Sequence, residues 1–454
     1  MNTPVIQRPT GAAYLAAEGV VRRLQGAGHA ALLAGGCVRD LLLGRVPKDY
    51  DMATSAASDE VRALFPDTRS VGARFGVTLV IADGMPFEVA TFRTESGYSD
   101  GRRPDRVQFS GIEEDARRRD FTINGMYWDP VSGRLVDTVG GRQDLAAGVV
   151  RAVGNPEERM REDHLRLIRA VRFAGRLGFR IEEETERAVR ALAPLIERIA
   201  AERLQQELRM ILTDPRPAGA LRMMDDLGML LLIFPELAAA KGCEQPENFH
   251  PEGDVFVHSL LTVEKLGSCP DFALALAALL HDIGKPEASR LAGPKSFPEH
   301  DRIGREMARE ICRRLRLSRL ETDRVCWLIH RHMYLKEAGK MRDSTLKRLF
   351  AEPGFEELCE LARADSLASW GRMDQIDYVL ERRRTMPPET INPPPLVNGH
   401  DLIERGYKPG PAMGRVLEEV RERQLRGEIT EREGALALAE RIARRINAPK
   451  EREG

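Results

Sequence analysis

The sequence predicts an α+β protein in which a mixed head is followed by helices to the end of the chain. Between about residues 30 and 150, short apolar runs alternate with Gly, Pro and Asp turns, a pattern typical of strands mixed with helices. Beyond residue 155 the pattern becomes almost entirely that of amphipathic helices. A chain of 454 residues is long enough for about three domains with substantial cores.

The overall charge argues against a protein that coats nucleic acid indiscriminately. Charged residues make up 31% of the chain, yet the formal net charge is −1. This balance still leaves room for a local basic face. Arginines do cluster, from Arg117 to Arg119 and again from Arg159 to Arg180, and that density favours phosphate contacts over a merely solvated helix face.

Cysteine usage and hydropathy predict the compartment. The six cysteines are scattered without a Cys-x-x-Cys pair, which fits a reducing cytosol and argues against a zinc knuckle. The N-terminus lacks a charged segment followed by an apolar core, and no apolar run of about 18 residues occurs. We therefore expect a soluble, cytoplasmic protein with no membrane partner.

The first candidate site is a glycine turn followed by two carboxylates. The apolar run from Ala31 to Ala34 reads as a buried strand that ends in Gly35 and Gly36, whose backbone amides can approach a triphosphate closely. Asp49 and Asp51 follow, and residues i and i+2 of an extended segment point to the same side. The two carboxylates can therefore hold a pair of divalent cations about 4 Å apart, and oxygen ligands favour magnesium or manganese over zinc.

A third carboxylate is expected from the next strand. The segment from Phe87 to Arg93 alternates apolar and polar residues like a half-buried strand, with Glu88 on the face opposite Phe87 and Val89. Its alternative interpretation is an exposed strand glutamate with no chemical role.

A short segment further along combines donors and acceptors. Arg118 and Arg119 precede Asp120 and Asn124 within one turn and helix start. The arginines can neutralise a triphosphate, while Asp120 and Asn124 can hold each other or the ribose hydroxyls. A helix N-cap at Asp120 is the structural alternative.

The segment from Glu162 to Arg172 suggests a reader of base edges. Helical spacing places Asp163 and Arg166 one turn apart, with Arg169 and Arg172 extending the same face. An ordinary surface ion pair is the alternative. An acceptor beside a donor matches the amino group and ring nitrogen of cytosine and adenine, whereas uracil and guanine present the reverse order. One Asp/Arg pair can therefore select C and A.

A second constellation consists of imidazoles and carboxylates. The apolar run from Ala273 to Leu280 predicts a buried helix that leaves the next two residues facing a cleft. Mixed nitrogen and oxygen ligands suit manganese, nickel, cobalt, iron or magnesium. The members are His258, His281, Asp282, His300, His330, His332 and Asp365.

Taken in order, the motifs resemble class II tRNA nucleotidyltransferases, the CCA-adding enzymes, a family that also contains bacterial poly(A) polymerases. The match is carried by Gly-Gly-x-Val-Arg-Asp-x-Leu-Leu-Gly, Asp-x-Asp, Arg-Arg-Asp-Phe-Thr-x-Asn, and Glu-Asp-x-x-Arg-x-x-Arg, from about residue 30 to 235 and again in the tail. The resemblance implies a polymerase-beta-like nucleotidyltransferase head at 25–153 and a helical, RNA- and base-binding neck at 154–240. A body at 250–385 and a helical tail at 396–450 would follow.

The resemblance also implies roles for the candidate residues. Asp49 and Asp51 would hold magnesium and act in catalysis, with Glu88 assisting, and residues 137 to 145 would resemble the springy element that couples head to neck. Asp163 and Arg166 would read the incoming base. The nucleotide-binding set would be Gly35, Gly36, Arg39, Arg119, Asp120, Asn124, Asp163, Arg166, Arg169 and Arg172.

The expected activity is addition of CMP and AMP from CTP and ATP to the tRNA 3′ end, with release of pyrophosphate. The segment from Arg93 to Phe109 resembles the flexible loop of family members that add the terminal A, and its Gly, Ser and Asp content fits mobility. An A-adding or CC-adding specialist remains an alternative. So does a poly(A) polymerase, although the segment from Val71 to Gly76 shares only part of the arginine-rich motif of those enzymes.

The histidine constellation resembles the HD phosphohydrolase superfamily. By motif position His258, His281, Asp282 and Asp365 would be ligands of a second divalent transition metal, and a metal-bound water would attack a phosphate ester. The alternative is a domain that keeps this fold but serves to hold RNA. Two further readings of the whole chain are an HD-type metal phosphohydrolase whose head merely binds nucleotide, and a non-catalytic RNA-binding protein. The oligomeric state stays open.

Overall fold

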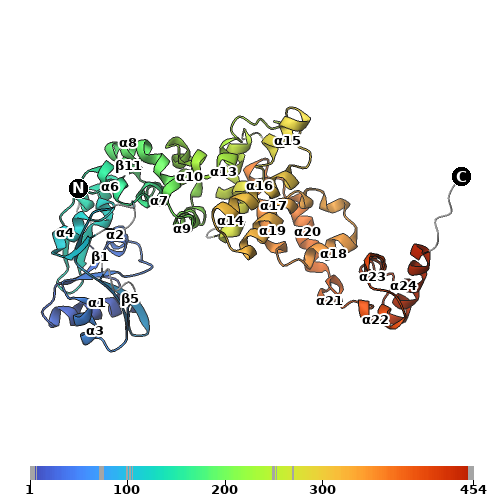
Figure 1. The fold of residues 1–454 in the computed structure, drawn as a ribbon, viewed down its shortest axis with the longest axis horizontal. Helices are drawn as coiled ribbons and strands as arrows, with labels where there is room; N and C mark the ends of the chain where they lie inside the picture. The colour runs from blue at the N-terminus through green and yellow to red at the C-terminus, as the bar shows by residue number, and fades with distance from the viewer. Residues whose placement is uncertain are drawn as a thin grey trace. The chain divides into compact units, whose positions relative to one another are not determined.

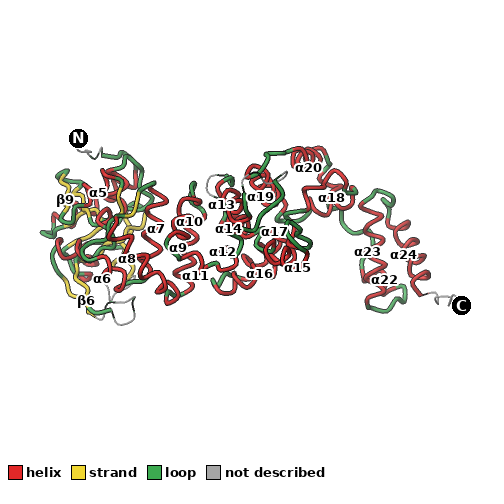
Figure 2. Tube along the Cα trace, turned by 90° about the horizontal axis from the view of Figure 1, so that it is seen from above, coloured by secondary structure: helices red, strands yellow, loops and turns green. Residues whose placement is uncertain are grey.

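The computed structural model divides the chain into two units, Met1–Ala239 with Arg313–Leu317 and Ala240–Cys312 with Ser318–Gly454. All strands belong to the first unit, as the yellow segments of Figure 2 show. The predicted α+β class, with a mixed head followed by helices, is confirmed. The four segment boundaries expected from the sequence stay predictions. The structure describes residues 6, 8–70, 76–98, 101, 104, 106–247, 251, 253–267 and 270–447.

The head is built on a seven-stranded sheet in the order β3-β4-β5-β2-β1-β8-β9, drawn in blue to cyan in Figure 1. β2 runs parallel to β5, and the other neighbouring pairs run antiparallel. The strands are β1 (Ala31–Ala34), β2 (Met52–Thr54), β3 (Thr68–Ser70), β4 (Val77–Ala82), β5 (Met85–Thr91), β8 (Met126–Asp129) and β9 (Arg134–Asp137).

The parallel pair of β2 and β5 positions the predicted carboxylates. Met52 is in register with Val89, so Asp51 and Glu88 lie at equivalent positions one residue earlier on neighbouring strands. β1 is buried along its length, as its apolar run predicted, and the amide of Ala34 donates to the carbonyl of Asp51. The turn after β1 therefore lies beside Asp51, and β5 with Glu88 follows on the other side of β2.

Gly35 shows why this turn needs glycine. Its φ is +74°, and a Cβ there would lie 2.9 Å from Nη1 of Arg119. A side chain would be strained by the backbone and would also push the guanidinium away. Helices of the head are α1 (Ala12–Gly26), α2 (Gly36–Leu42), α3 (Ser58–Leu64), α4 (Ile112–Arg117), the 3₁₀ turn η2 (Thr122–Asn124) and α5 (Gly141–Ala147).

The segment from Arg93 to Phe109, which was expected to be a flexible loop, begins and ends with two strands that pair as a hairpin. β6 (Arg93–Ser96) pairs antiparallel with β7 (Arg106–Phe109). Part of its tip lies outside the described residues. Residues 71–75, which carry the partial match to the poly(A) polymerase motif, also lie outside them.

The rest of the first unit is helical apart from the short parallel pair β10 (Val149–Val150) and β11 (Arg180–Ile181). Asn155 caps α6 by accepting the amide of Glu158, and Pro156 stands in the first turn of that helix. The helices include α6 (Pro156–Glu162), α7 (Leu165–Leu177), α8 (Glu183–Leu192), α9 (Ala201–Leu212) and α10 (Pro217–Asp226).

The described part of the second unit is built from helices. α14 (Phe272–Leu280) is buried at every residue, which confirms the prediction from its apolar run and leaves His281 and Asp282 directly after its end. None of the described helices is long and apolar enough to cross a membrane. Other elements used below are α13 (Val255–Glu264), α15 (Lys285–Ala292), α16 (His300–Arg314), α17 (Arg319–Arg331), η4 (Tyr334–Lys340), α19 (Phe355–Ala368) and α20 (Asp374–Thr385).

The end of the chain has a small core of its own. α22 (Gly399–Glu404), α23 (Pro411–Leu425) and α24 (Arg432–Asn447) contribute buried side chains such as Leu402, Val416 and Ala439 to one cluster. The predicted amphipathic helices of the tail are thus present.

Candidate functional site

Three exposed carboxylates meet at the head sheet. Asp49, Asp51 and Glu88 are all exposed. The protein atoms around the Asp51 carboxylate still desolvate it, and Glu88 and Asp49 repel its charge, so its pKa is raised to about 6 against the opposing effect of Arg119. A divalent cation relieves such repulsion between carboxylates. The oxygen-only donor set fits magnesium or manganese.

Asp115 holds the arginines of this site, and sequence reasoning missed it. It is 1% exposed, and it accepts from Nη2 of Arg118 at 2.7 Å, Nη2 of Arg119 at 3.1 Å and the hydroxyl of Tyr127 at 2.6 Å. Although burial alone would raise the pKa of Asp115, Arg119 and Arg118 hold it below its usual value. The sequence feature that could have identified Asp115 is its spacing of three and four positions from Arg118 and Arg119, which brings the three side chains together when the segment is helical.

Arg119 keeps one donor unused. Its guanidinium lies 5.4 Å from the centre of the Tyr127 ring, beside the turn at Gly35. The Nε atom is buried and has no hydrogen-bond partner among the described residues. A buried donor without an acceptor is costly, and the atom of this guanidinium that lies at the glycine turn is Nη1.

Asp120, Asn124 and Arg39 form a chain of contacts. Nδ2 of Asn124 donates to Oδ1 of Asp120 at 3.0 Å, and Nη1 of Arg39 donates to Oδ1 of Asn124 at 2.8 Å. Asp120 and Asn124 were expected to hold either each other or the ribose hydroxyls, and in the structure they contact each other. The N-cap alternative is wrong, because the residue that precedes η2 is Phe121. Arg39 is 4% exposed and also donates to Asp40.

The predicted helical face of Asp163 and Arg166 is wrong. α6 ends at Glu162, Asp163 is extended with φ −141°, and α7 begins at Leu165. The carboxylate of Asp163 accepts the amide of Leu165 at 3.1 Å. Such a local side-chain bond competes with the helix and starts a new one.

Each of the two side chains has a partner of its own. Asp163 accepts two bonds from Arg203 of α9, at 3.1 Å and 2.8 Å. Arg166 donates to Oε2 of Glu162 at 2.6 Å and to the backbone carbonyls of Arg159 and Arg118 at 2.8 Å and 3.2 Å. Both groups are held in place, but not by each other.

Arg169 and Arg172 are also paired. Arg169 donates to Oδ2 of Asp120 at 2.9 Å and 2.5 Å, and Arg172 donates to Oε2 of the buried Glu207 at 2.5 Å. Burial alone would raise the pKa of Asp120, but Arg169 and Asn124 hold it below its usual range. Both guanidinium groups also lie against the ring of Phe173. These contacts connect the candidate base-reading residues of α7 to the segment around Asp120.

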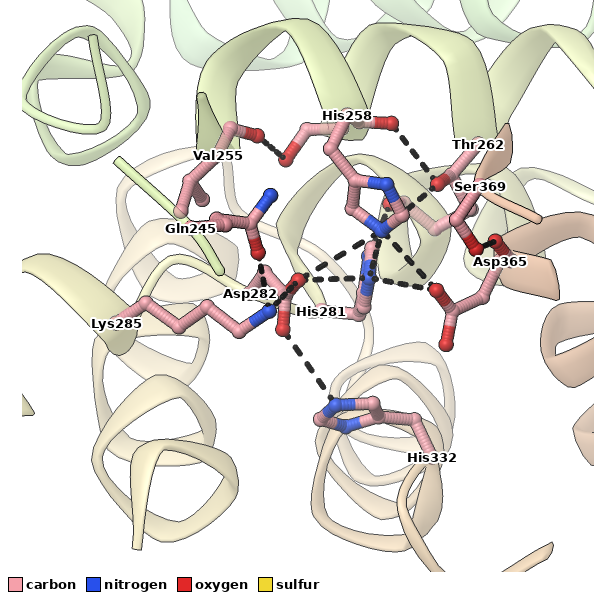
Figure 3. Close-up of polar contacts among 12 residues, drawn as sticks. Gln245, Val255, His258, Thr262, His281, Asp282, Lys285, His332, Asp365 and Ser369 are labelled. Carbon is pink, nitrogen blue, oxygen red and sulfur yellow. Dashed lines mark hydrogen bonds and ion pairs between the residues drawn. The ribbon is translucent and has the colours of Figure 1, made fainter. Parts of the chain in front are cut away.

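The histidine constellation separates into two adjoining groups of three. Their potential ligand atoms lie within 4.8 Å of one another inside each group. In the first, Nε2 of His258 lies 3.0 Å from Asp365 and 3.3 Å from Nε2 of His281. Figure 3 shows these side chains facing one another. The second group consists of Asp282, His300 and His332, with the two Nε2 atoms 3.4 Å and 3.6 Å from Oδ1 of Asp282.

The tautomers of three histidines follow from their backbone contacts. Nδ1 of His281, His300 and His332 lies 2.8 Å, 2.8 Å and 2.6 Å from the carbonyls of Ala278, Phe297 and Ile329 respectively. A carbonyl can only accept, so Nδ1 carries the proton and the Nε2 lone pair faces the cluster. Burial, the main cause, lowers the pKa of His332 to about 4. Neutral imidazoles with inward lone pairs are metal ligands.

Asp282 provides the test of whether a metal fits. It is 2% exposed, and its Oδ1 has no hydrogen-bond partner among the described residues. Its Oδ2 accepts from Lys285 at 2.6 Å, and Lys285 also donates to Gln245, as Figure 3 shows. Burial alone would raise the pKa of Asp282, but His281 and Lys285 hold it well below its usual value. An ionised, buried oxygen facing imidazole lone pairs fits a divalent transition metal.

His330 does not belong to this cluster, contrary to the predicted constellation. It pairs instead with Asp301 at 3.0 Å and is one-third exposed. His330 lies only two positions before His332 in the sequence, but positions i and i+2 near a helix end point to different sides. His300 and His332, which were not among the four ligands expected by motif position, contribute to the second group.

Three family models match the chain in succession. The poly A polymerase head domain covers residues 31–151, the probable RNA and SrmB-binding site of polymerase A covers residues 178–241, and the HD domain covers residues 255–370. The HD match contains all members of the histidine constellation.

Curated relatives are similar over about half of the chain's length. A CCA-adding enzyme of Geobacillus thermodenitrificans is 44% identical over 214 residues, or 47% of this chain and 53% of the relative. One of Lactiplantibacillus plantarum is 44% identical over 211 residues, or 46% and 52% respectively. The chain is thus aligned with about half the length of the curated relatives it matches.

Solved structures resemble the chain over nearly its whole length. The CCA-adding enzyme of Bacillus stearothermophilus in complex with CTP is 28% identical, with a TM-score of 0.74 over 96% of this chain and 99% of that one. A CCA-adding enzyme of Thermotoga maritima complexed with tRNA shares the fold, with a TM-score of 0.57 and 21% identity over 98% of each chain.

Proposed function

We propose that this chain, which belongs to the family of tRNA nucleotidyltransferases and bacterial poly(A) polymerases and carries an HD domain, adds CMP and AMP from CTP and ATP to the tRNA 3′ end. The single observation that carries this proposal is the meeting of Asp49, Asp51 and Glu88 with the glycine turn and Arg119. Because tRNA and nucleoside triphosphates are the proposed substrates, we propose the cytoplasm as its location.

The residues of the head have distinct roles in the proposed reaction. The 3′ oxygen of the tRNA attacks the α-phosphorus, the bond to the β-phosphate breaks, and pyrophosphate leaves. Asp49 and Asp51, with Glu88 assisting, would hold two magnesium ions, which supply charge neutralisation at the attacking and leaving oxygens. Arg119 offers Nη1, which lies beside Gly35, to the triphosphate, and the turn at Gly35 and Gly36 lets the phosphates approach the backbone.

Neighbouring side chains keep these donors in position. Asp115 holds Arg119, while Asn124 connects Arg39 to Asp120. Each guanidinium therefore enters the reaction already oriented, which lowers the entropy lost on binding the nucleotide. We propose that Asp120 and Asn124 present their remaining acceptor and donor capacity to the ribose.

Base choice is proposed to rest on Asp163 and Arg166, each held by its own partner. Arg203 fixes the Asp163 carboxylate and Glu162 fixes the Arg166 guanidinium, so an acceptor and a donor keep separate, fixed positions. Such a pair can bond the amino group and ring nitrogen of cytosine or adenine. Arg169 and Arg172 would lie beside the base.

Replacing both base-reading residues is expected to relax selectivity. In an Asp163→Ala, Arg166→Ala variant, the preference for CTP over UTP should fall by at least about 5-fold, because one bidentate base contact contributes roughly 1–3 kcal/mol of discrimination. Single-turnover incorporation of each triphosphate measures the ratio. Arg161→Ala is the matched control, since this arginine is 59% exposed on α6; unchanged selectivity in the double variant would reject the assignment.

The identity of the added nucleotides separates this proposal from its alternatives. Labelled CTP and ATP, supplied separately, should enter transcripts that end before CCA, after C and after CC in the order C, C, A. Incorporation of A alone after CC would identify an A-adding specialist, C-only addition a CC-adding one, and long A tails a poly(A) polymerase.

A second candidate function is metal-dependent hydrolysis of phosphate esters at the HD site. It is favoured by the two adjoining ligand groups, His258, His281 and Asp365 beside Asp282, His300 and His332. We propose that they hold a divalent transition metal, whose chemistry when bound is to activate a water for attack on phosphorus. A domain that keeps these ligands only to stabilise an RNA-holding fold is the alternative.

Removal of one histidine should remove the metal. His281→Ala is expected to lower bound manganese or nickel, measured by elemental analysis of the purified chain, to less than about a tenth of the wild-type content, because a buried ligand with an inward lone pair is lost. His330→Ala is the matched control, since His330 lies outside both groups. Equal metal content in the two variants would contradict the site.

A further inference from the structure

A cavity of 370 Å³ adjoins the first HD ligand group. Its volume lies within the roughly 300–1,000 Å³ typical of small-molecule sites. Asp365, one of the three potential ligands in that group, is also part of the cavity wall. The remaining lining residues come from η4, α19, α20 and the turn between α19 and α20. They include Leu335, Lys336, Trp370, Arg372, Gln375 and Ile376.

The two oxygens of Asp365 face different neighbours. Oδ1 lies 3.0 Å from Nε2 of His258, and Oδ2 lies 3.2 Å from Nζ of Lys336. Lys336 and Arg372 both line the cavity and bring positive charge to it, while Asp374, which also lines it, brings one negative charge. A phosphate bound at the ligand group would therefore meet cations on the cavity side, which suits an anionic ester.

Trp370 forms an aromatic wall of the same cavity. Trp370 is 55% exposed, so its indole is accessible to a ligand. Leu335 and Ile376, both buried, line the cavity with it. An indole face that lines an apolar cavity is a stacking platform for a planar ring.

The turn that carries Trp370 is tied to the helix that carries Asp365. Ser369 donates through Oγ to the carbonyl of Asp365 at 3.1 Å, and the amide of Gly371 donates to the carbonyl of Ser366 at 2.7 Å. Gly371 has φ +69°, so the chain reverses there at no steric cost to a side chain. The backbone that carries the indole is therefore held against the end of the helix that carries the carboxylate.

We propose that this cavity binds the nucleobase of a nucleotide whose phosphate lies at the HD ligand groups, with Trp370 stacking on the base. The inference deepens the proposed hydrolase function and rests on it for the position of the phosphate. A sugar phosphate or an acyl phosphate would satisfy the cations but leave the indole without a planar partner. A nucleotide satisfies both ends of the site.

The test is calorimetric titration of the full manganese-loaded chain with AMP and with ribose 5-phosphate, which carries the same phosphate without a base. Wild-type protein should bind AMP between about 5-fold and 150-fold more tightly, the range for one base–aromatic stack. Trp370→Leu should remove this difference, and Trp370→Phe should retain most of it. Leu367→Ala, an exposed position on α19 outside the cavity, should bind as the wild type does.

The outcomes separate the base site from the hydrolase function. Unchanged AMP affinity in Trp370→Leu overturns the base site. Trp370-dependent binding without hydrolysis of any nucleotide ester supports the base site and contradicts the hydrolase. If the protein hydrolyses a nucleotide ester and Trp370→Leu leaves the KM unchanged, the hydrolase function is supported and the base site is overturned. If Trp370→Leu raises the KM at constant kcat, both are supported.

Discussion

Asp49→Ala is expected to reduce incorporation of CMP and AMP into tRNA by at least about 10³-fold while the protein keeps its fold. The proposed magnesium pair contributes several kcal/mol of charge stabilisation at the reacting oxygens, and the variant removes one of its carboxylates. The side chain is exposed, so its loss leaves no cavity in the core. Single-turnover incorporation at saturating CTP measures the effect.

Asp59→Ala is the control for this result. Asp59 is an exposed aspartate on α3 of the same unit, and its replacement should leave incorporation within about 2-fold of the wild type, as is usual for surface sites. Retention of more than a tenth of wild-type activity by a folded Asp49→Ala protein would remove Asp49 from the catalytic centre.

Asp115→Ala is expected to destabilise the first unit by about 3–5 kcal/mol, because it leaves buried charged donors without their acceptor. Arg118, Arg119 and Tyr127 all donate to this one carboxylate. The melting temperature of the unit should fall by about 10 °C, as differential scanning calorimetry would show. In the fraction that remains folded, the KM for CTP should rise, since Arg119 is no longer held at the glycine turn.

Glu114→Ala controls for helix position and charge. Glu114 precedes Asp115 on α4, but its side chain is 42% exposed, so its loss should cost less than about 1 kcal/mol. An equal, small effect of both substitutions would show that Asp115 does not organise the arginines.

Features that depend on neighbouring residues could be predicted from the sequence. The strand before Gly35, the capping of α6 by Asn155 and the buried helix before His281 each follow from a local pattern of apolar, turn or capping residues. The carboxylates Asp51 and Glu88 were expected together from motif order, and the register of β2 with β5 gives the reason for their proximity.

Contacts between distant segments could not be predicted in this way. Arg203 lies 40 residues from Asp163, and Glu207 lies 35 residues from Arg172; nothing in their local sequence distinguishes them from solvent-exposed charges. The break at Asp163 was missed because helical spacing of Asp and Arg is the same whether the helix continues or restarts. The hydrogen bond that the Asp163 carboxylate accepts from the amide of Leu165 makes the helix restart there instead of continuing.

The HD site illustrates the same limit. Motif position identified His258, His281, Asp282 and Asp365, whereas the separation into two groups and the inclusion of His300 and His332 depend on where the helices α13, α14, α16, α17 and α19 converge. His330 was grouped with them because of its nearness in sequence, but the helix end directs it toward Asp301.

The most direct test of the central claim is to incubate the purified chain with magnesium, all four nucleoside triphosphates and a tRNA transcript that lacks its CCA end, and then to sequence the 3′ termini. The proposed function predicts addition of C, C and A followed by arrest, and no addition by Asp49→Ala protein. Termini that remain unextended, or the same extension by Asp49→Ala protein, would contradict it.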